Sequence, residues 1–324
     1  MRRISDFTVN EFNVLKHIKL IVPVCTLEQE YTILSCDVND ILLPPLYREL
    51  VADQELDALA CLIQKQLIPK REGCSLQMHH DDCMRPAIMV PRAEDKAIFA
   101  VDPIEQHGPF LNIGTDATIS SNVINRLVKR YPFLRPVKSL FYANLSWGLA
   151  LGASISIPTA LEVKMLSRYV EYLRRKGFGG AVIVSTHLAR SHQAALATLK
   201  KRYPSFDLRI LYPLKALDET NSDAHAGLTE TAISAYLDLD VRLDLLIETH
   251  DRVRVLSKEA VIRRVRASGK NFKAYADRIG WSGIVGDLQM SGHEVCEIPR
   301  LLRWYGKNYF HSVLNHCACA IERI

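Results

Sequence analysis

The chain has 324 residues, of which 48% are hydrophobic and 24% charged, and its 41 basic and 36 acidic side chains give a formal charge of +5. This composition excludes a largely disordered chain, because a globular protein of this length buries roughly three quarters of its unfolded surface and the apolar content suffices for that. Basic residues occur singly or in short groups after amphipathic runs, so we expect no nucleic-acid partner. No apolar run is long enough for a membrane span or a signal peptide, so we expect a cytoplasmic protein, with no membrane partner, whose eight cysteines are reduced.

Residues 1–92 differ in pattern from the rest of the chain. A helical pattern covers 46–66, and prolines and a polar stretch with cysteines surround it. We interpret 1–92 as an N-terminal extension or small extra domain, and 93–324 as the main domain. The extension has two candidate roles, as a lid over an active site or as part of an oligomer interface.

Residues 97–237 alternate between strand-like and helix-like patterns. The expected strands cover 97–101, 140–143, 181–184 and 208–212. Helical spacing of apolar residues fills the intervals, from Asp116 to Tyr131, from Leu161 to Gly177 and over 191–202. This alternation predicts a parallel sheet covered by helices on both faces.

A short stretch near the N-terminus, 21–29, aligns with 98–106 at a constant offset of 77 residues. The similarity ends there, because Glu30 stands where His107 would be. Two interpretations remain open, a degenerate duplication or a chance similarity between two strand ends.

The residues suited to chemistry gather after the first strand of the main domain. Glu105 and His107 are two residues apart, so they point the same way if the chain stays extended. Asp116 begins the next helix, where one of its oxygens can cap the helix while the other binds a metal. Ligands of open α/β sheets bind at the carboxyl ends of the strands. Two carboxylates and an imidazole at that edge suit zinc, manganese or iron.

Two later strand ends supply further candidates of the same kind. His187 follows the strand at 181–184, and His225 and Glu230 follow the strand at 208–212. Three strand ends therefore deliver histidines and carboxylates to one rim of the predicted sheet, which indicates a metal site more strongly than any single motif.

These motifs together resemble the creatininase (creatinine amidohydrolase) family. The matching strings are Glu-Gln-His-Gly-Pro with Gly-Thr-Asp over 105–116, the strand followed by His187, and His-Ala-Gly-x-x-Glu-Thr over 225–231. The segment 283–294 is similar to the family's C-terminal Gly-Asp and Gly-Glu motif. The resemblance covers residues 97–300.

The resemblance implies a three-layer α/β/α fold with a mainly parallel central sheet, assembled as a homo-oligomer, commonly a hexamer. It also implies two divalent metal ions (Zn, Mn or Fe) and a small-molecule substrate. By motif matching, Asp116 bridges both ions, Glu105 and His187 complete one site, and His107 and Glu230 complete the other. A metal-bridged hydroxide would then attack an amide-type carbonyl.

Further roles follow from the same comparison of motifs. Glu230 takes a ligand role because Ala189 stands where creatininase carries a metal-binding Glu, and His225 matches the family's candidate acid for the leaving nitrogen. The alternative for His225 is a structural histidine. Arg190 can bind a substrate carboxylate or phosphate, or form a surface salt bridge. Trp147 lines the substrate pocket, or packs in the core or at an oligomer contact.

The ligand positions match the family, whereas the loops at 152–159 and 188–190 depart from it, so we expect a substrate other than creatinine. The first hypothesis is a hydrolase of C–N bonds other than peptide bonds, acting on a cyclic amide or a formamide. The resemblance also extends to deformylases of formamidopyrimidine nucleotides and to a peptidase that trims a modified peptide. The second hypothesis is amide or lactam formation in a biosynthetic pathway, and the third is a non-catalytic assembly or regulatory subunit.

Overall fold

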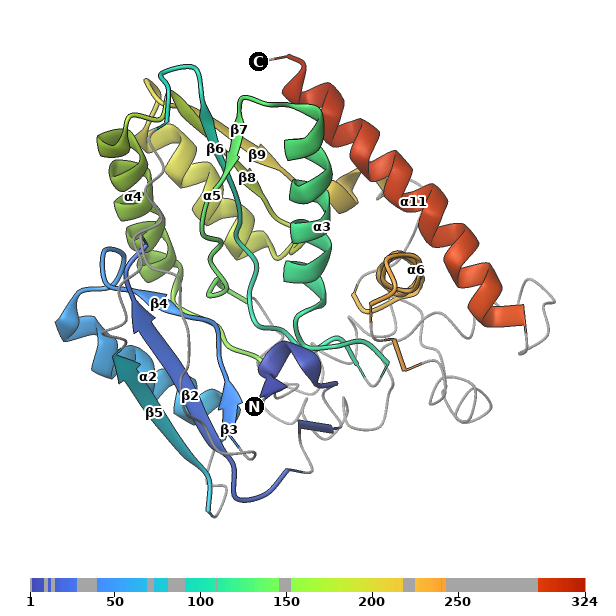
Figure 1. Ribbon diagram of the computed structural model, residues 1–324. Coiled ribbons are helices and arrows are strands. Elements are labelled where there is room, and N and C mark those ends of the chain that lie inside the picture. The colour runs from blue at the N-terminus through green and yellow to red at the C-terminus, as the bar shows by residue number, and fades with distance from the viewer. Residues whose placement is uncertain are drawn as a thin grey trace.

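A computed structural model gives the arrangement of the chain (Figure 1). It describes residues 2–8, 11–12, 15–27, 40–68, 73–80, 91–108, 110–145, 153–217, 225–239, 241–242 and 297–323. Within these residues the chain forms two parallel sheets, one before residue 81 and the other from residue 96 onward.

The later sheet has four strands in the order β7-β6-β8-β9, all parallel. Its strands are β6 (Lys96–Ala100), β7 (Leu134–Pro136), β8 (Gly180–Val184) and β9 (Asp207–Leu211). Every residue of β8 is buried, which explains why its sequence is continuously apolar rather than alternating. The prediction of a parallel sheet is confirmed.

Helices cover both faces of this sheet, as Figure 1 shows. They are α3 (Thr115–Arg130), α4 (Thr159–Lys176), α5 (Arg190–Arg202), η3 (Pro213–Leu217), α6 (Leu228–Tyr236) and α11 (Ile298–Ile321). Ile98 and Val182 share a core cluster with residues of α3, η3 and α11, whereas Phe99 and Ile183 share another with residues of α4 and α5. Because successive residues of a strand point to opposite faces, these clusters are the two sides of the sheet. The three-layer α/β/α fold is therefore confirmed.

The earlier sheet belongs to the N-terminal segment and is also parallel. Its elements, with the accompanying helices, are β1 (Arg2–Arg3), η1 (Ile4–Asp6), β2 (Lys19–Cys25), β3 (Asp40–Leu42), β4 (Leu46–Tyr47), α2 (Asp53–Leu67) and β5 (Ser75–His80). β2 pairs with β3, β4 and β5. Leu59 and Ile63 of α2 belong to the same buried cluster as Tyr169 of α4, so the two sheets share one continuous core.

Two predicted elements are placed wrongly by the sequence patterns. The helix expected over 46–66 begins only at Asp53, because Leu46 and Tyr47 instead pair with β2 as strand β4. The strand expected over 140–143 is instead β7, and of the expected residues only Leu140 forms a bridge, to Val101. The short β7 has a single buried residue, so no apolar run marks it in the sequence.

The end of α4 agrees with the sequence. Gly177 caps this helix in the left-handed conformation, with φ of 94°, which glycine adopts without the strain that a Cβ would bring. Among the helices within the described ranges, none is long and apolar enough to cross a membrane.

Candidate metal centre

The first part of the site is the loop that leaves β6. Glu105 and His107 lie on this loop, with only 3% and 1% of their surfaces exposed. The chain turns at Gly108, where φ is 72°, and enters α3, whose first turn carries Asp116. Asp116 is 2% exposed, so two carboxylates and an imidazole are buried together at the carboxyl edge of the sheet.

Asp116 lies between two histidines. Its Oδ1 is 3.6 Å from Nε2 of His107, and its Oδ2 is 3.6 Å from Nδ1 of His187. His187 follows β8, the neighbour of β6, and its Nδ1 is also 2.9 Å from Oε2 of Glu105. A carboxylate with one oxygen toward each of two histidines has the arrangement required of a ligand shared by two ions.

The remaining side chains come from the segment that begins α6. Glu230 lies in the first turn of this helix, and its Oε1 is 3.9 Å from Nε2 of His107 while its Oε2 accepts the backbone N–H of Ala226. His225 packs its ring against that of His107, with centroids 4.5 Å apart. Its Nε2 is 2.7 Å from the backbone oxygen of Gln106, which fixes the orientation of the imidazole.

The six side chains form two groups of three. Within each group, the nitrogen and oxygen atoms that could bind a metal lie within 4.8 Å of one another. The groups are Glu105, Asp116 and His187, and His107, His225 and Glu230. The structure therefore brings together all six histidine and carboxylate candidates from the sequence. It also places His225 among the ligand-type atoms, where the sequence comparison gave it only an acid's role.

The hydrogen bonds of the histidines fit a metal. Nδ1 of His107 is 3.0 Å from the backbone oxygen of Glu105, and its Nε2 is buried without a hydrogen-bond partner. Metal-binding histidines commonly donate one ring N–H to a carbonyl and present the other nitrogen to the ion. In His187 it is Nδ1 that faces Glu105 and Asp116, and Nε2 is buried without a hydrogen-bond partner.

Charge within the cluster shifts its pKa values strongly. Burial disfavours the imidazolium of His107, but the carboxylates of Asp116 and Glu230 outweigh it and raise the pKa to about 10. Burial also opposes the charged form of His187, yet Glu105 and Asp116 raise its pKa well above the ordinary value. Burial would raise the pKa values of Asp116 and Glu105, but the nearby histidines lower both. In the metal-free cluster the carboxylates therefore favour the protonated forms of His107 and His187.

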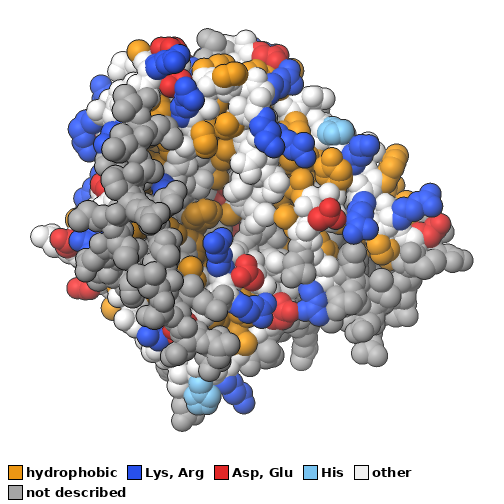
Figure 2. All heavy atoms as spheres, viewed as in Figure 1, with side chains coloured by type: hydrophobic (Ala, Val, Ile, Leu, Met, Phe, Trp, Pro, Cys, Tyr) orange, Lys and Arg blue, Asp and Glu red, His pale blue; other side chains and the backbone are white. Residues whose placement is uncertain are grey.

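Of the two candidate substrate-binding residues, the structure describes only Arg190. Arg190 is the exposed first residue of α5, three residues after His187. Trp147 lies outside the described residues. On the face drawn in Figure 2, basic side chains are interspersed with acidic and apolar ones.

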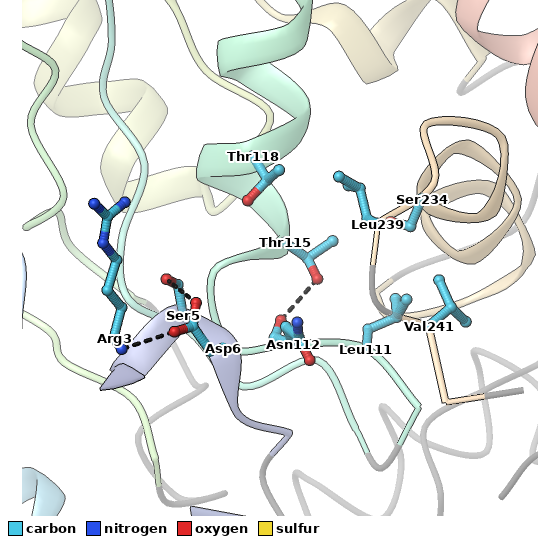
Figure 3. Close-up of a pocket in the computed structure, with 10 residues that line it drawn as sticks. All are labelled: Arg3, Ser5, Asp6, Leu111, Asn112, Thr115, Thr118, Ser234, Leu239 and Val241. Carbon is cyan, nitrogen blue, oxygen red and sulfur yellow. Dashed lines mark hydrogen bonds between the residues drawn. The ribbon is translucent and has the colours of Figure 1, made fainter. Parts of the chain in front are cut away.

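A separate hollow lies beside the first turn of α3 (Figure 3). It has a volume of about 270 Å³, and its lining includes Arg3, Asn112, Thr115, Thr118 and Ser234, but not Asp116. Oδ1 of Asn112 and Oγ of Ser234 are buried without a hydrogen-bond partner. This hollow is polar, but it is not lined by any of the six clustered side chains.

Sequence reasoning missed four buried polar residues that connect to the loop of His187. They are Asp102, Glu162, Ser185 and His192. Asp102 and Ser185 each follow a strand, which was an available signal, since polar residues at strand ends often belong to sites. Glu162 and His192 are 30 residues apart on different helices, so no local pattern connects them.

The fold and the cluster define an α/β protein with a histidine–carboxylate centre at the carboxyl edge of its parallel sheet. Comparison with known families agrees with this class. The family model described as creatininase, creatinine amidohydrolase, matches residues 89–295, and the chain belongs to the creatininase family.

Individual relatives are distant. The mycofactocin precursor peptide peptidase of Mycolicibacterium smegmatis is 26% identical over 256 residues, which are 77% of this chain and 88% of that protein. A crystal structure of creatinine amidohydrolase (creatininase) is similar with a TM-score of 0.50 and 16% identity, over 71% of this chain and 90% of the other. A structure described as "Creatininase Mn" has a TM-score of 0.41 and 18% identity, over 47% of this chain and 68% of the other. The likeness to the structure with the TM-score of 0.50 shows a shared fold.

Proposed function

We propose that this chain is a metal-dependent amidohydrolase that cleaves a C–N bond of a small substrate, a cyclic amide or a formamide. The observation that carries the proposal is Asp116, whose two oxygens face two different histidines at 3.6 Å each. In this proposal Glu105 and His187 would hold one divalent ion, His107 and Glu230 would hold another, and Asp116 would serve both. Histidine and carboxylate ligands suit Zn, Mn and Fe alike.

The ions, when bound, would lower the pKa of a water molecule and offset the negative charge that develops on the substrate's carbonyl oxygen. The chain's own residues supply orientation and proton transfer. His225 is held by the backbone oxygen of Gln106, and its ring lies against His107, so a proton on this imidazole is within the site. We assign His225 the transfer of that proton to the leaving nitrogen. Glu230 holds its position through the N–H of Ala226.

Substrate recognition is proposed for Arg190 and Trp147. The exposed guanidinium of Arg190 at the start of α5 suits a substrate carboxylate or phosphate. A peptide amide is a second candidate substrate, because the relative from Mycolicibacterium smegmatis is described as a peptide peptidase. Profiling lactams, formamides and short peptides with the metal-loaded protein separates these substrates.

Metal analysis tests the proposal directly. We expect about two transition-metal ions per chain in the wild type, because the proposed mechanism uses two ions. His107→Ala should lower that number, whereas His316→Ala, which removes an exposed histidine of α11, should leave it unchanged. A wild type that binds no zinc or manganese after reconstitution would contradict the hydrolase and leave a non-catalytic homologue.

The N-terminal segment contacts the loop that carries Glu105 and His107, and it also contacts a second loop that packs against the first. Gln66 of α2 exchanges two hydrogen bonds of 2.9 Å with the backbone of Ser156, and Ser154, on the same loop, accepts the N–H of Gln106 through its Oγ. On the other loop, Ile113 donates to the backbone oxygen of Phe7. We propose that the segment 1–92 supports these loops in addition to any role in a homo-oligomer, whose size sedimentation velocity would measure.

A further inference from the structure

Four buried polar side chains form a connected set beside His187. Asp102 follows β6, Ser185 follows β8, His192 lies on α5 and Glu162 on α4. The first three are 0% exposed and Glu162 is 1% exposed. None of them belongs to the two ligand groups described above.

Hydrogen bonds connect the four residues in order. The carboxylate of Glu162 pairs with Nδ1 of His192, and Nε2 of His192 is 3.0 Å from Oγ of Ser185. Oγ of Ser185 is in turn 3.2 Å from Oδ1 of Asp102 and 3.2 Å from the backbone oxygen of His187. The helices α4 and α5 and the ends of two strands each contribute one member. The set therefore connects four elements that are far apart in the sequence.

The contacts of Asp102 connect the set to the backbone of His187. Oδ1 of Asp102 accepts the backbone N–H of Thr186 at 2.9 Å and that of His187 at 3.2 Å. Ser120 of α3 accepts the N–H of Thr186 as well, at 3.1 Å. The backbone that carries the His187 imidazole is therefore held by a strand end on one side and by the helix of Asp116 on the other.

Burial makes these bonds consequential. A carboxyl group that is fully removed from water is costly unless it accepts hydrogen bonds. Oδ2 of Asp102 is buried without a hydrogen-bond partner, so the N–H groups of Thr186 and His187 and the hydroxyl of Ser185, all at Oδ1, are what offset the burial of this side chain. Removing it would leave the N–H of His187 without this acceptor. The imidazole of His187 would then lose its fixed position toward Glu105 and Asp116.

We propose that Asp102, backed by Ser185, His192 and Glu162, is a positioning network that holds His187 for metal binding. This inference rests on the proposed function, because the held imidazole is there a metal ligand. The four residues touch neither substrate nor ions, and they act through the backbone of 185–187.

The test compares four variants for zinc binding and for amide hydrogen exchange. Asp102→Ala removes the acceptor, Asp102→Asn keeps an oxygen at the same place, and Ser185→Ala breaks the connection to His192. Ser167→Ala is the matched control, because Ser167 is a buried hydroxyl of α4 that bonds Arg202 outside the network.

We expect Asp102→Ala to weaken one of the two zinc equivalents about 10- to 100-fold, the range found when partners of metal ligands are removed. The other equivalent should keep its affinity within a few-fold. Asp102→Asn should recover most of the loss, Ser185→Ala should show a smaller loss of the same equivalent, and Ser167→Ala should bind as the wild type does. In metal-free protein, exchange of the Thr186 and His187 amides should accelerate in Asp102→Ala and, to a smaller extent, in Ser185→Ala, but not in Ser167→Ala.

Two results would overturn the inference. One is wild-type zinc affinity for both equivalents in Asp102→Ala. The other concerns Ser185→Ala, which provides the test if Asp102→Ala does not fold. Wild-type zinc binding by Ser185→Ala, together with wild-type amide exchange at 185–187 in this variant, would contradict the network. Failure of the proposed function is distinguished by the wild type, which would then bind no zinc. That result would also overturn the role of the network in positioning a metal ligand.

Discussion

Metal binding should release protons, because the carboxylates of the metal-free site favour the protonated forms of His107 and His187. Burial opposes this charge, but Asp116 and Glu230 raise the pKa of His107 to about 10, and Glu105 and Asp116 raise that of His187 well above its ordinary value. A metal ion binds only the neutral imidazole. At pH 7.5 the proton on His107 therefore weakens the apparent affinity about 300-fold relative to a neutral ring, since each pKa unit is tenfold.

The sign of the pH dependence follows. Below the pKa of His107, apparent affinity should rise about tenfold per pH unit for the ion it binds, and it should level off as the pH approaches about 10. In metal-free protein the same shift stabilises the fold below the unfolded pKa of about 6.5, and this stabilisation is lost as the pH rises through about 10. Metal affinity and metal-free stability should thus change in opposite directions with pH.

Calorimetry in buffers of different ionisation enthalpy measures the released protons. Two zinc equivalents at pH 7.5 should release about two protons from the imidazoles of His107 and His187, in addition to the proton that a metal-bound water loses. His107→Ala should lower the release by one, and His316→Ala should not change it. A binding enthalpy independent of the buffer would refute the reasoning, because it would mean that both imidazoles are neutral before the metal binds.

Three further predictions concern catalysis and stability. His225→Gln should keep both ions while turnover falls about 10²- to 10⁴-fold, the usual contribution of a general acid; loss of an ion would make His225 a ligand instead. Gly306→Ala should lower the free energy of unfolding by about 1–3 kcal/mol in urea titrations, because its Cβ would lie 1.9 Å from the backbone oxygen of Ala232, and an unchanged midpoint would contradict this packing of α11 on α6. Phe12→Ala should cost about 3–5 kcal/mol, because Phe12 is 0% exposed, and a cost below about 1 kcal/mol would show that the N-terminal segment is loosely attached.

The candidate site was predictable because each of its parts has a local signal. Glu105 and His187 come a few residues after apolar strands, and Asp116 and Glu230 lie in the first turns of helices. Parallel strands bring their carboxyl ends to one edge of the sheet, so residues that follow such strands are predicted to lie at the same edge. Whether the rim binds metal is a separate question that the calorimetry above addresses.

The positioning network was not predictable in the same way. Asp102 accepts hydrogen bonds from residues more than 80 positions later, and Glu162 meets His192 from a different helix. Their meeting depends on how α4 and α5 pack on the sheet, which periodicity along one helix does not specify. The support from the N-terminal segment was missed for the same reason, since Gln66 and Ser156 are 90 residues apart.

The repeat at an offset of 77 residues has a structural counterpart. Lys19 of β2 pairs with Asp40 and Ser75, and Lys96 of β6, at the equivalent position, pairs with Leu134 and Gly180.

The agreement continues along the strands without a slip in register. Val24 pairs with Leu46, and its equivalent Val101 forms a bridge to Leu140. Leu43 likewise donates to Ile21 as Val137 does to Ile98. Matching register on both sides of a strand is what a duplicated unit would retain, and chance similarity of two strand ends would not require it.

The two units differ in the length of the connection that follows the first strand. Residues 26–39 make this connection in the N-terminal unit, whereas the longer 101–133 makes it in the later one. The longer connection carries Glu105, His107 and Asp116, together with the helix that presents Asp116. The same strand pairing therefore occurs twice in the same register. Glu105 still falls within the aligned stretch, opposite Glu28, whereas His107 and Asp116 lie beyond it on the longer connection.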